Sequence, residues 1–280
     1  PNVPVVMISG HGTIETAVAA IKKGAYDFVE KPFKADRLIT MVGRAIDAAR
    51  LKRENADLRR RYGGDDDLIG QSSSISQLRA AIDRVAPTDS RVLITGPPGS
   101  GKEVVARLLH ARSRRSAGPF VTLNCATMSP DRVEIELFGT EGDNESPTHA
   151  RVVGTFEQAH GGTLLLDEVI DMPPQTQGKI ARVLQEQTFV RVGGTTKVNV
   201  DVRVIATSNR DLQSEMSAGR FRPDLYYRLN VVPLEVPPLA ERRDDIPVLL
   251  ERFMSRVAEA SGMAPRFFAP DAVAALQAYD

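Results

Sequence analysis

A glycine-rich loop that ends in lysine is the clearest chemical signal in this 280-residue sequence. It reads Gly96-Pro97-Pro98-Gly99-Ser100-Gly101-Lys102-Glu103, between an apolar run at 92–94 and apolar residues at helical spacing from 104 to 109. Strand, glycine loop and helix in this order predict a phosphate-binding loop, because glycines let backbone N–H groups turn toward an anion. The helix start adds unpaired N–H donors, and Lys102 would supply a charge to the outer phosphates. Glu103 departs from the general pattern, in which a Ser or Thr holds magnesium.

Two adjacent carboxylates follow a second apolar run. The segment at 161–166 reads Gly-Gly-Thr-Leu-Leu-Leu and continues into Asp167 and Glu168. A run of this kind suits a buried parallel strand, and ligands collect at the carboxyl ends of such strands. Asp167 is therefore placed to hold Mg through water and Glu168 to polarise an attacking water, although an ordinary Asp-Glu turn is the alternative. Together, the two sites predict nucleoside triphosphate hydrolysis.

Further strands are expected at 120–123, 202–207 and 231–236, with helices between them. They complete a five-stranded α/β nucleotide-binding core over residues 68–237. Asn124 and Asn209 each follow a strand, where they could contact phosphate, water or Glu168; isolated asparagines also serve as turn residues.

Two arginines add a possible subunit contact. Arg222 and Arg228 are six residues apart and would not share one face of a straight helix. They suit the two sides of a subunit junction, where arginine can neutralise charge on a γ-phosphate. Surface salt bridges are the alternative.

Composition excludes several other classes. Lys plus Arg and Asp plus Glu both number 36, so no overall charge points to nucleic acid or an anionic membrane. No apolar stretch is long enough to span a membrane, which favours a soluble, cytoplasmic protein. Cys125 is the only cysteine and is expected to be buried, and the four histidines show no metal-ligand spacing.

The first 47 residues have a β-α-β-α pattern. Strands are expected at 3–8 and 25–30, a helix between Thr13 and Gly24, and another from Asp36. This order implies a parallel sheet that two strands and two helices cannot cover alone. A generic α/β fragment would fit.

These residues also resemble the second half of a two-component receiver domain, with a flavodoxin-like fold. Ser9 matches the switch hydroxyl, Tyr26 the switch aromatic, and Lys31-Pro32 the phosphate-contacting lysine with its cis proline. The resemblance implies a sensor histidine kinase as partner. It also implies that the phosphorylated aspartate lies outside this segment.

Residues 48–67 form a predicted helical linker, rich in Ala, Leu and charge and broken at 63–67 by Gly-Gly-Asp-Asp-Asp. A basic run here is more typical of a solvated helix face than of a nucleic-acid surface. A short coiled coil pairing two subunits is the functional alternative, although Arg53 falls on its seam.

Residues 68–280 resemble the AAA+ ATPase domain of sigma-54-dependent transcription activators of the NtrC type. The resemblance runs through the phosphate loop, 123–126 (Leu-Asn-Cys-Ala), 136–139 (Glu-Leu-Phe-Gly), 161–168, 191–194, 221–230, 236–239 and 241–247. In that family a Glu follows the loop lysine, so Glu103 fits the pattern.

The resemblance implies a ring, normally a hexamer, with ATP at each subunit junction. Lys102 and Asp167 would serve phosphate and Mg, and Glu168 the water. Asn124 would couple Glu168 to the nucleotide state and Asn209 would act as a sensor. Arg222 and Arg228 would reach the site of the next subunit.

One segment departs from the family pattern. Where the family has Gly-Ala-Phe-Thr-Gly-Ala, which pushes on the sigma factor, positions 143–148 read Asp-Asn-Glu-Ser-Pro-Thr. The aromatic anchor of that contact is missing. The combination resembles the NtrX branch of nitrogen-regulation response regulators and argues against remodelling of the sigma-54 RNA polymerase. Two functions remain open: an ATPase response regulator, and a non-motor, nucleotide-binding regulator whose output is DNA occupancy.

Residues 238–280 are expected to begin a helical lid, with an apolar stripe over 246–257 and a second helix from Asp271. In the family, a second sensor arginine and a DNA-binding helix-turn-helix domain lie beyond this region.

Overall fold

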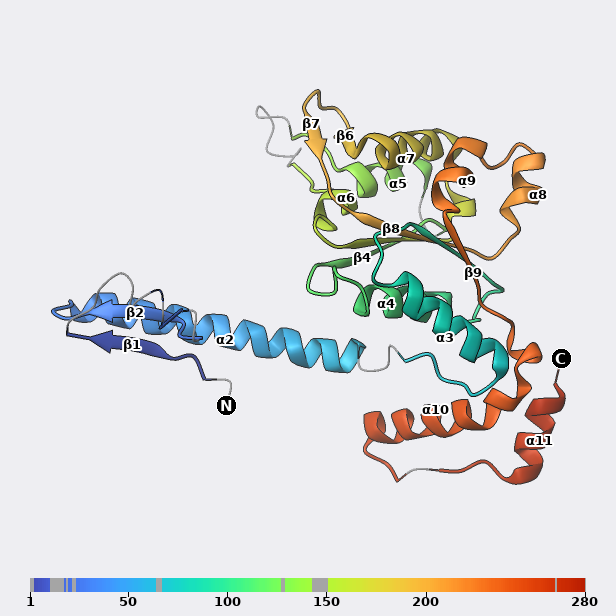
Figure 1. Cartoon of the computed structure of the whole chain (residues 1–280), viewed down its shortest axis with the longest axis horizontal. Helices are drawn as coiled ribbons and strands as arrows, with labels where there is room; N and C mark the ends of the chain where they lie inside the picture. Colours follow the sequence, from blue (N-terminus) through green and yellow to red (C-terminus); the bar gives the residue numbers. More distant parts are fainter. Residues whose placement is uncertain are drawn as a thin grey trace. The chain divides into compact units, whose positions relative to one another are not determined.

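A computed structural model describes residues 3–10, 18, 20–21, 24–63, 67–126, 129–142, 151–264 and 266–279. The chain divides into two compact units, Pro1–Asp65 and Asp66–Asp280 (Figure 1). The helix expected between Thr13 and Gly24 and the altered segment at 143–148 lie largely or wholly outside the described residues.

The first unit pairs strand β1 (Val6–Ser9) in parallel with β2 (Asp27–Glu30), followed by helix α2 (Ala35–Gly63). The first strand begins later than predicted. Pro4 lacks the N–H that a strand needs, whereas Ser9 belongs to the strand and accepts a hydrogen bond from the Lys31 N–H at 2.8 Å. The Lys31–Pro32 bond is cis, as the receiver resemblance implied. Helix α2 runs on to Gly63, through most of the span expected to be a helical linker.

The second unit is built on a five-stranded parallel sheet of order β4-β5-β8-β3-β9 (Figure 1). The strands are β3 (Val92–Thr95), β4 (Phe120–Asn124), β5 (Thr163–Asp167), β8 (Arg203–Ser208) and β9 (Val232–Glu235). All five strands were predicted, and most of their observed ends differ from the predicted ends by one residue. Their common direction brings the carboxyl ends of β3, β4, β5 and β8 to one edge.

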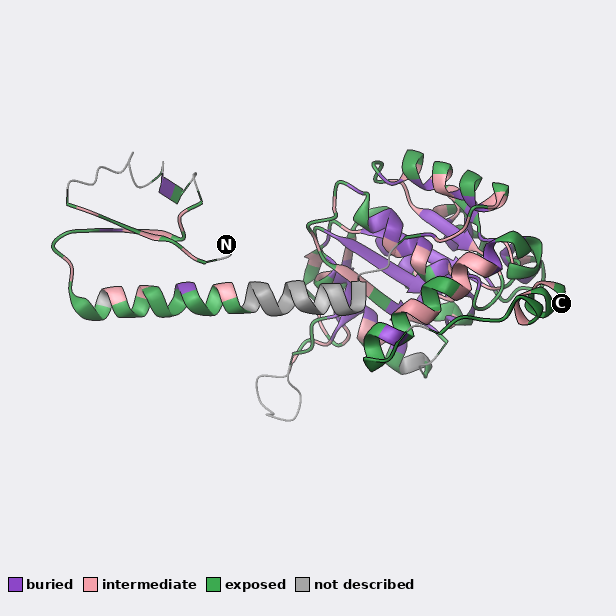
Figure 2. Ribbon diagram, turned by 90° about the horizontal axis from the view of Figure 1, so that it is seen from below, coloured by how far each residue is buried: buried purple, intermediate pink, exposed green. Residues whose placement is uncertain are grey.

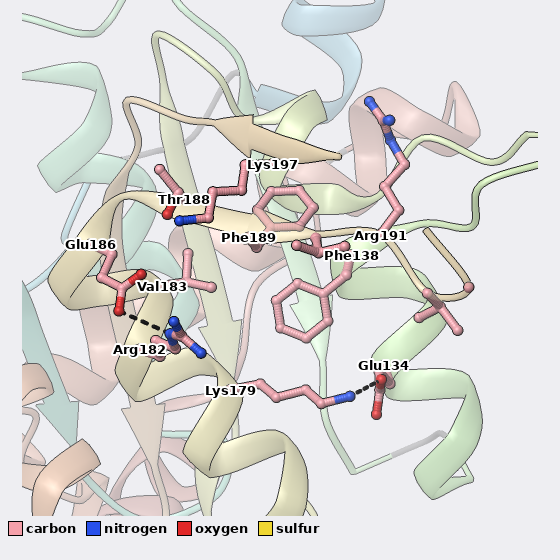
Figure 3. A pocket seen from close by; sticks show the side chains of 13 residues that line it. Glu134, Phe138, Lys179, Arg182, Val183, Glu186, Thr188, Phe189, Arg191 and Lys197 are labelled. Atoms are coloured by element: carbon pink, nitrogen blue, oxygen red, sulfur yellow. Dashed lines mark hydrogen bonds and ion pairs between the residues drawn. The ribbon is translucent and has the colours of Figure 1, made fainter. Parts of the chain in front are cut away.

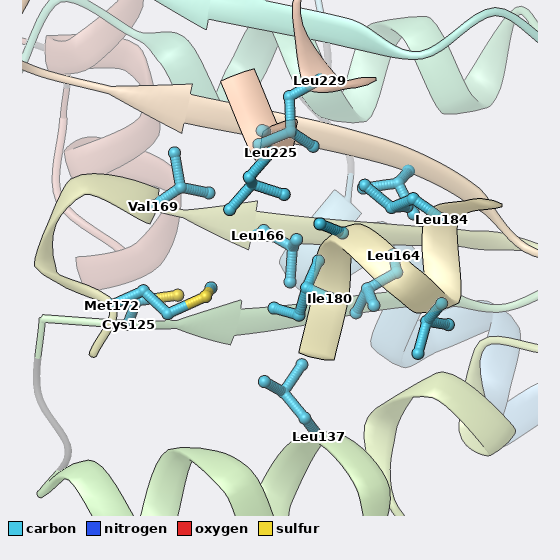
Figure 4. Close-up of a cluster of buried hydrophobic side chains, with 14 of the residues drawn as sticks. Cys125, Leu137, Leu164, Leu166, Val169, Met172, Ile180, Leu184, Leu225 and Leu229 are labelled. Atoms are coloured by element: carbon cyan, nitrogen blue, oxygen red, sulfur yellow. The ribbon is translucent and has the colours of Figure 1, made fainter. Parts of the chain in front are cut away.

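Helices cover both faces of this sheet because side chains alternate along each strand. In β5, Leu165 joins a core with α3 (Ser73–Val85) and α4 (Lys102–Ala111). Leu164 and Leu166 join the opposite core, with α5 (Pro130–Phe138), α6 (Thr155–Gln158), α7 (Pro174–Glu186) and α9 (Pro223–Leu229) (Figure 4). Burial follows this layering: the central strands β3, β5 and β8 are enclosed, whereas the edge strands and the outer helix faces are partly exposed (Figure 2).

An antiparallel hairpin of β6 (Thr188–Val190) and β7 (Lys197–Asn199) was not predicted, because its three-residue strands are too short to show an alternating pattern. The remaining elements are α8 (Leu212–Ser217), α10 (Ile246–Ser261), α11 (Pro270–Ala278) and the 3-10 turns Val169–Asp171, Leu239–Glu241 and Arg243–Asp245. The two helices expected after 238 are therefore present. The apolar stripe of α10 is only partly covered, since Phe253 and Val257 are 53% and 56% exposed.

A buried arginine fastens the hairpin to the core. Arg191 donates two hydrogen bonds to Glu157, both at 2.8 Å, and one to Glu141 at 2.9 Å. These hydrogen bonds raise the pKa of Arg191 and lower that of Glu157. The clamp holds the chain at Glu141, just before the segment at 143–148.

Candidate functional site

The loop between β3 and α4 contains backbone conformations and close contacts that only glycine can accommodate. Gly101 has φ 104°, a conformation that L side chains rarely adopt, and a Cβ there would meet no atom within 4 Å. Gly96 is needed for a different reason: its Cβ would lie 2.5 Å from the Val236 carbonyl oxygen, at the end of β9. The loop therefore packs against the sheet at Gly96 and is open at Gly101.

Helix α4 starts at this loop without a side-chain cap. Its N-cap residue is Gly101, which has no side chain that could satisfy the first N–H groups. The free N–H groups and the helix dipole favour an anion at this point.

Lys102 is buried beneath the loop, with 6% of its surface exposed. Its Nζ donates to the carbonyl oxygens of Gly96 at 3.0 Å and Pro97 at 3.3 Å. It also lies 3.1 Å from Glu168 Oε1. Lys102 thus joins the glycine loop to Glu168, the residue that directly follows β5.

Asp167, the last residue of β5, is held on both carboxylate oxygens. Thr207 donates its hydroxyl to Oδ1 at 2.7 Å, and the Asn124 side-chain amide donates to Oδ2 at 3.1 Å. Phosphate, water and Glu168 were the contacts expected for Asn124; its side-chain amide donates to Asp167, which the register of β4 and β5 places beside it.

Glu168 has a left-handed backbone, with φ 55° and ψ 58°. This conformation is costly for a side chain other than glycine and is typical of functional sites. Its N–H donates to Thr207 Oγ1 at 2.9 Å, and its Oε2 accepts from the Asn209 N–H at 2.8 Å. Asn209 therefore meets Glu168 through its backbone.

Two polar atoms at the site lack partners among the described residues. Ser100 Oγ and Asn209 Oδ1 are buried without a hydrogen bond. Buried polar atoms are normally satisfied, so unsatisfied ones next to an open anion cradle fit a missing polar ligand. Asp167 keeps acceptor capacity beyond its two hydrogen bonds, which suits the waters of a magnesium ion. The residues therefore fit a nucleotide with Mg.

Three predicted site residues lie outside this cluster. Glu103 is on the exposed side of α4, where it pairs with Arg107 at 2.6 Å. Arg222 pairs with Asp224 at 2.8 Å, and Arg228 donates to Gln185 at 2.6 Å. Both arginines belong to the surface around α9, and no described contact joins either to the phosphate loop.

Thr207 and Arg242 make contacts at the site that the sequence did not predict. Thr207 links Asp167 to the Glu168 backbone, and a single hydroxyl near the end of an apolar strand was its only signal. Arg242 is buried and donates to the Ser100 carbonyl oxygen at 2.7 Å. Its contact spans 142 residues, and nothing local in the sequence indicates it.

Two other features lie apart from the chemistry. A cavity of about 350 Å³ is lined by residues of α5, α7 and the β6–β7 hairpin, among them Phe138, Phe189 and Lys197 (Figure 3). None of the phosphate-loop residues lines it. Cys125 is buried, as expected, and burial raises its pKa to about 12, which keeps the thiol protonated.

Within the described parts of the chain, no three His, Cys, Asp or Glu side chains form a metal-binding group. No described helix is long and apolar enough to cross a membrane.

The parallel sheet, the glycine loop before α4 and the carboxylates at the end of β5 define the α/β fold of AAA+ P-loop proteins, preceded by part of a receiver. Residues 68–235 match the model of the sigma-54 interaction domain, and residues 1–43 match that of the response regulator receiver domain. The chain belongs to the sigma-54 interaction domain family.

Several relatives match over the whole chain. The nitrogen assimilation regulatory protein NtrX of Azorhizobium caulinodans is 55% identical over 280 residues, which are 100% of this chain and 61% of that protein. A crystal structure of NtrX from Brucella abortus has a TM-score of 0.87 at 57% identity, covering 100% of this chain and 62% of that one. A structure of the same protein in complex with ATP has a TM-score of 0.86 at 57% identity, covering 100% and 60%. The chain thus spans about three fifths of the length of these relatives.

Proposed function

We propose that this chain is the nucleotide-binding part of a two-component transcriptional response regulator that binds ATP with Mg and hydrolyses it. One observation carries the proposal: Lys102 and the carboxylates Asp167 and Glu168 lie together at the start of a helix that has no side-chain cap. The NtrX structure in complex with ATP supports ATP as the nucleotide.

In this proposal, the N–H groups at 99–103 and Lys102 bind the phosphates. Lys102 must first leave Glu168, and its release frees the carboxylate. Glu168 then orients a water and accepts its proton, while the Asn209 N–H holds the other carboxylate oxygen. Bound Mg would neutralise charge on the phosphates, and Asp167 would hold it through water, aligned by Thr207 and Asn124.

The two arginines at α9 fit a role between subunits. Arg222 is exposed and Arg228 is half-buried, and among the described residues neither contacts the phosphate site of its own chain. We infer that they reach the nucleotide of a neighbouring subunit in a ring, normally a hexamer in this family. A pairing through α2 would give a dimer as the smaller assembly.

The remaining assignments follow from the domain order. Residues 1–47 would be the second half of a receiver addressed by a sensor histidine kinase, 48–67 a linker, 68–237 the ATPase core and 238–280 the start of a lid. DNA contact would come from a domain outside this chain.

A second function is favoured by one observation, the acidic sequence at 143–148 in place of the family's aromatic-tipped loop. In that case nucleotide binding orders the subunit, the sigma-54 polymerase is not remodelled, and DNA occupancy is the output.

Nucleotide titration and phosphate release on the full-length protein test both functions. Wild type should bind ATP, and Lys102→Ala should lose binding by about a hundredfold, because a buried charge-assisted contact to phosphate is removed. Glu168→Gln should still bind but release no phosphate. Binding without hydrolysis in the wild type would leave the non-motor function. No binding would refute both.

A further inference from the structure

Arg242 is a buried cation at the start of the lid region, and it takes no part in the catalytic steps proposed above. It is 7% exposed, and its Nη2 donates to the Ser100 carbonyl oxygen at 2.7 Å. Its Nε has no hydrogen-bond partner among the described residues. Burying a guanidinium with one unsatisfied N–H group costs free energy of folding, so we expect Arg242 to have a role beyond packing.

The contact with Ser100 fixes the direction of one peptide group. In a planar trans peptide, the C=O of Ser100 and the N–H of Gly101 point to opposite sides. Arg242 holds the C=O on the side of the lid, which turns the Gly101 N–H toward the other side. The carbonyl oxygen of Gly101 accepts a hydrogen bond from the Val105 N–H at 3.2 Å, within α4, so the peptide after Gly101 is held by the helix and the peptide before it by Arg242.

The same turn also holds the segment before α3. Asp245 is fully buried and accepts hydrogen bonds from the N–H groups of Gln71 and Ser72, at 2.6 and 2.8 Å, and from Ser72 Oγ at 2.7 Å. A Cβ on Gly70 would lie 2.6 Å from Asp245 Oδ2, so only glycine fits there. Arg242 and Asp245 therefore grip the phosphate loop and the 70–72 segment from one short turn.

Helix α10 begins at Ile246, directly after this turn. Three residues therefore separate Arg242 from the first residue of α10.

We propose that Arg242 is a positioning residue, which holds the Ser100–Gly101 peptide so that the Gly101 N–H faces the phosphates of the nucleotide. This inference rests on the proposed nucleotide binding. Its consequence is specific: Arg242 contributes to the affinity for the phosphate part of the ligand and not for the nucleoside part.

Displacement of a fluorescent ADP derivative from the full-length protein tests this. ADP, inorganic pyrophosphate and adenosine would each be titrated against wild type and Arg242→Met. Loss of one charge-assisted hydrogen bond and of the oriented N–H should weaken ADP and pyrophosphate about tenfold, with adenosine unchanged. Arg242→Lys keeps a cationic N–H donor on a shorter side chain, so it should bind ADP and pyrophosphate more tightly than Arg242→Met but more weakly than wild type. Arg243→Ala, the exposed neighbour in the same turn, is the matched control and should change none of the three affinities.

The results distinguish a positioning role of Arg242 from a purely structural one, and both from a failure of the proposed nucleotide binding. An equal loss for all three ligands would mean that Arg242 only supports the fold and would overturn the inference. Unchanged ADP and pyrophosphate affinities in a folded Arg242→Met or Arg242→Lys protein would also overturn it. Failure of the wild type to bind any ligand would instead refute the proposed function. If Arg242→Met does not fold, Arg242→Lys carries the same comparison.

Discussion

Lys102 Nζ and Glu168 Oε1 lie 3.1 Å apart, although one side chain belongs to the phosphate loop and the other follows β5. Both are largely buried, at 7% and 15% of side-chain exposure, so the ion pair is poorly screened by water. In the proposed function, a phosphate must replace Glu168 as the partner of Lys102. The base is therefore occupied until a nucleotide arrives, which would suppress its action without substrate.

Thr207 is the first target for mutation. Thr207→Val removes the hydroxyl that links Asp167 Oδ1 to the Glu168 N–H, while keeping the shape of the side chain. We expect a stability loss of about 1–3 kcal/mol and hydrolysis reduced at least tenfold, because both carboxylates lose their alignment. Urea unfolding and phosphate release measure the two effects. Thr122→Val, at an exposed position of the neighbouring strand β4, should alter neither.

Mixing two inactive variants tests whether Arg222 acts between subunits. Lys102→Ala and Arg222→Ala should each be inactive alone. In an equimolar mixture, about a quarter of the junctions combine an intact Lys102 with an intact Arg222 from the neighbour, so hydrolysis should partly return.

A mixture of Lys102→Ala and Glu168→Gln is the control for this experiment. Both residues belong to the same side of the site, so this mixture should stay inactive. If the Arg222 mixture is equally inactive, the arginine does not act in trans.

Gln187 offers a stabilising substitution away from the site. It ends α7 with φ 52° and ψ 28°, a left-handed conformation that favours glycine. Gln187→Gly should raise the free energy of unfolding by about 0.5–1 kcal/mol, because the strain of a Cβ is removed. Gln187→Ala removes the same side chain without relieving the backbone and should give no gain; equal Tm values for the two variants would contradict this reason.

The Arg191 clamp should be sensitive even to a conservative change. Arg191→Lys removes the paired hydrogen bonds to Glu157 in a buried setting, and we expect a loss of about 2 kcal/mol or more. Arg182→Lys is the matched control, because the Arg182–Glu186 pair is exposed along α7, and it should stay within about 0.5 kcal/mol. Denaturant unfolding compares the two, and similar losses would show that the clamp is not special.

The same clamp predicts a pH dependence. The Arg191 hydrogen bonds hold the pKa of Glu157 below its ordinary value of 4.5 in the folded state. The folded state therefore gains stability from Glu157 at pH values above 4.5, and this gain is lost as the pH falls through the lower folded pKa. The difference in unfolding free energy between wild type and Glu157→Gln should be constant from pH 7 to about 5 and shrink in more acid solution. A difference that grows on acidification would have the wrong sign.

The core strands were well predicted because their signals are local. Leu164, Leu165 and Leu166 are apolar in sequence, and all three are fully buried between helices on both faces. The hairpin β6–β7 and the start of β1 were not predicted correctly, since three-residue strands and a proline near a strand end leave little pattern to read. The motifs of the candidate site could be read from the sequence, whereas the contacts between them could not.

The sequence by itself determined the glycine loop between β3 and α4, the carboxylates Asp167 and Glu168 at the end of β5, and the five strands. These signals are local, because a positive φ selects glycine at its own position and a buried strand is a run of neighbouring apolar residues. Only the tertiary structure decided that Asn124 meets Asp167 and not Glu168, that Thr207 joins both carboxylates, and that Arg242 reaches Ser100. These contacts join residues 39 to 142 positions apart. They depend on strand order and register, and therefore on the packing of the whole sheet.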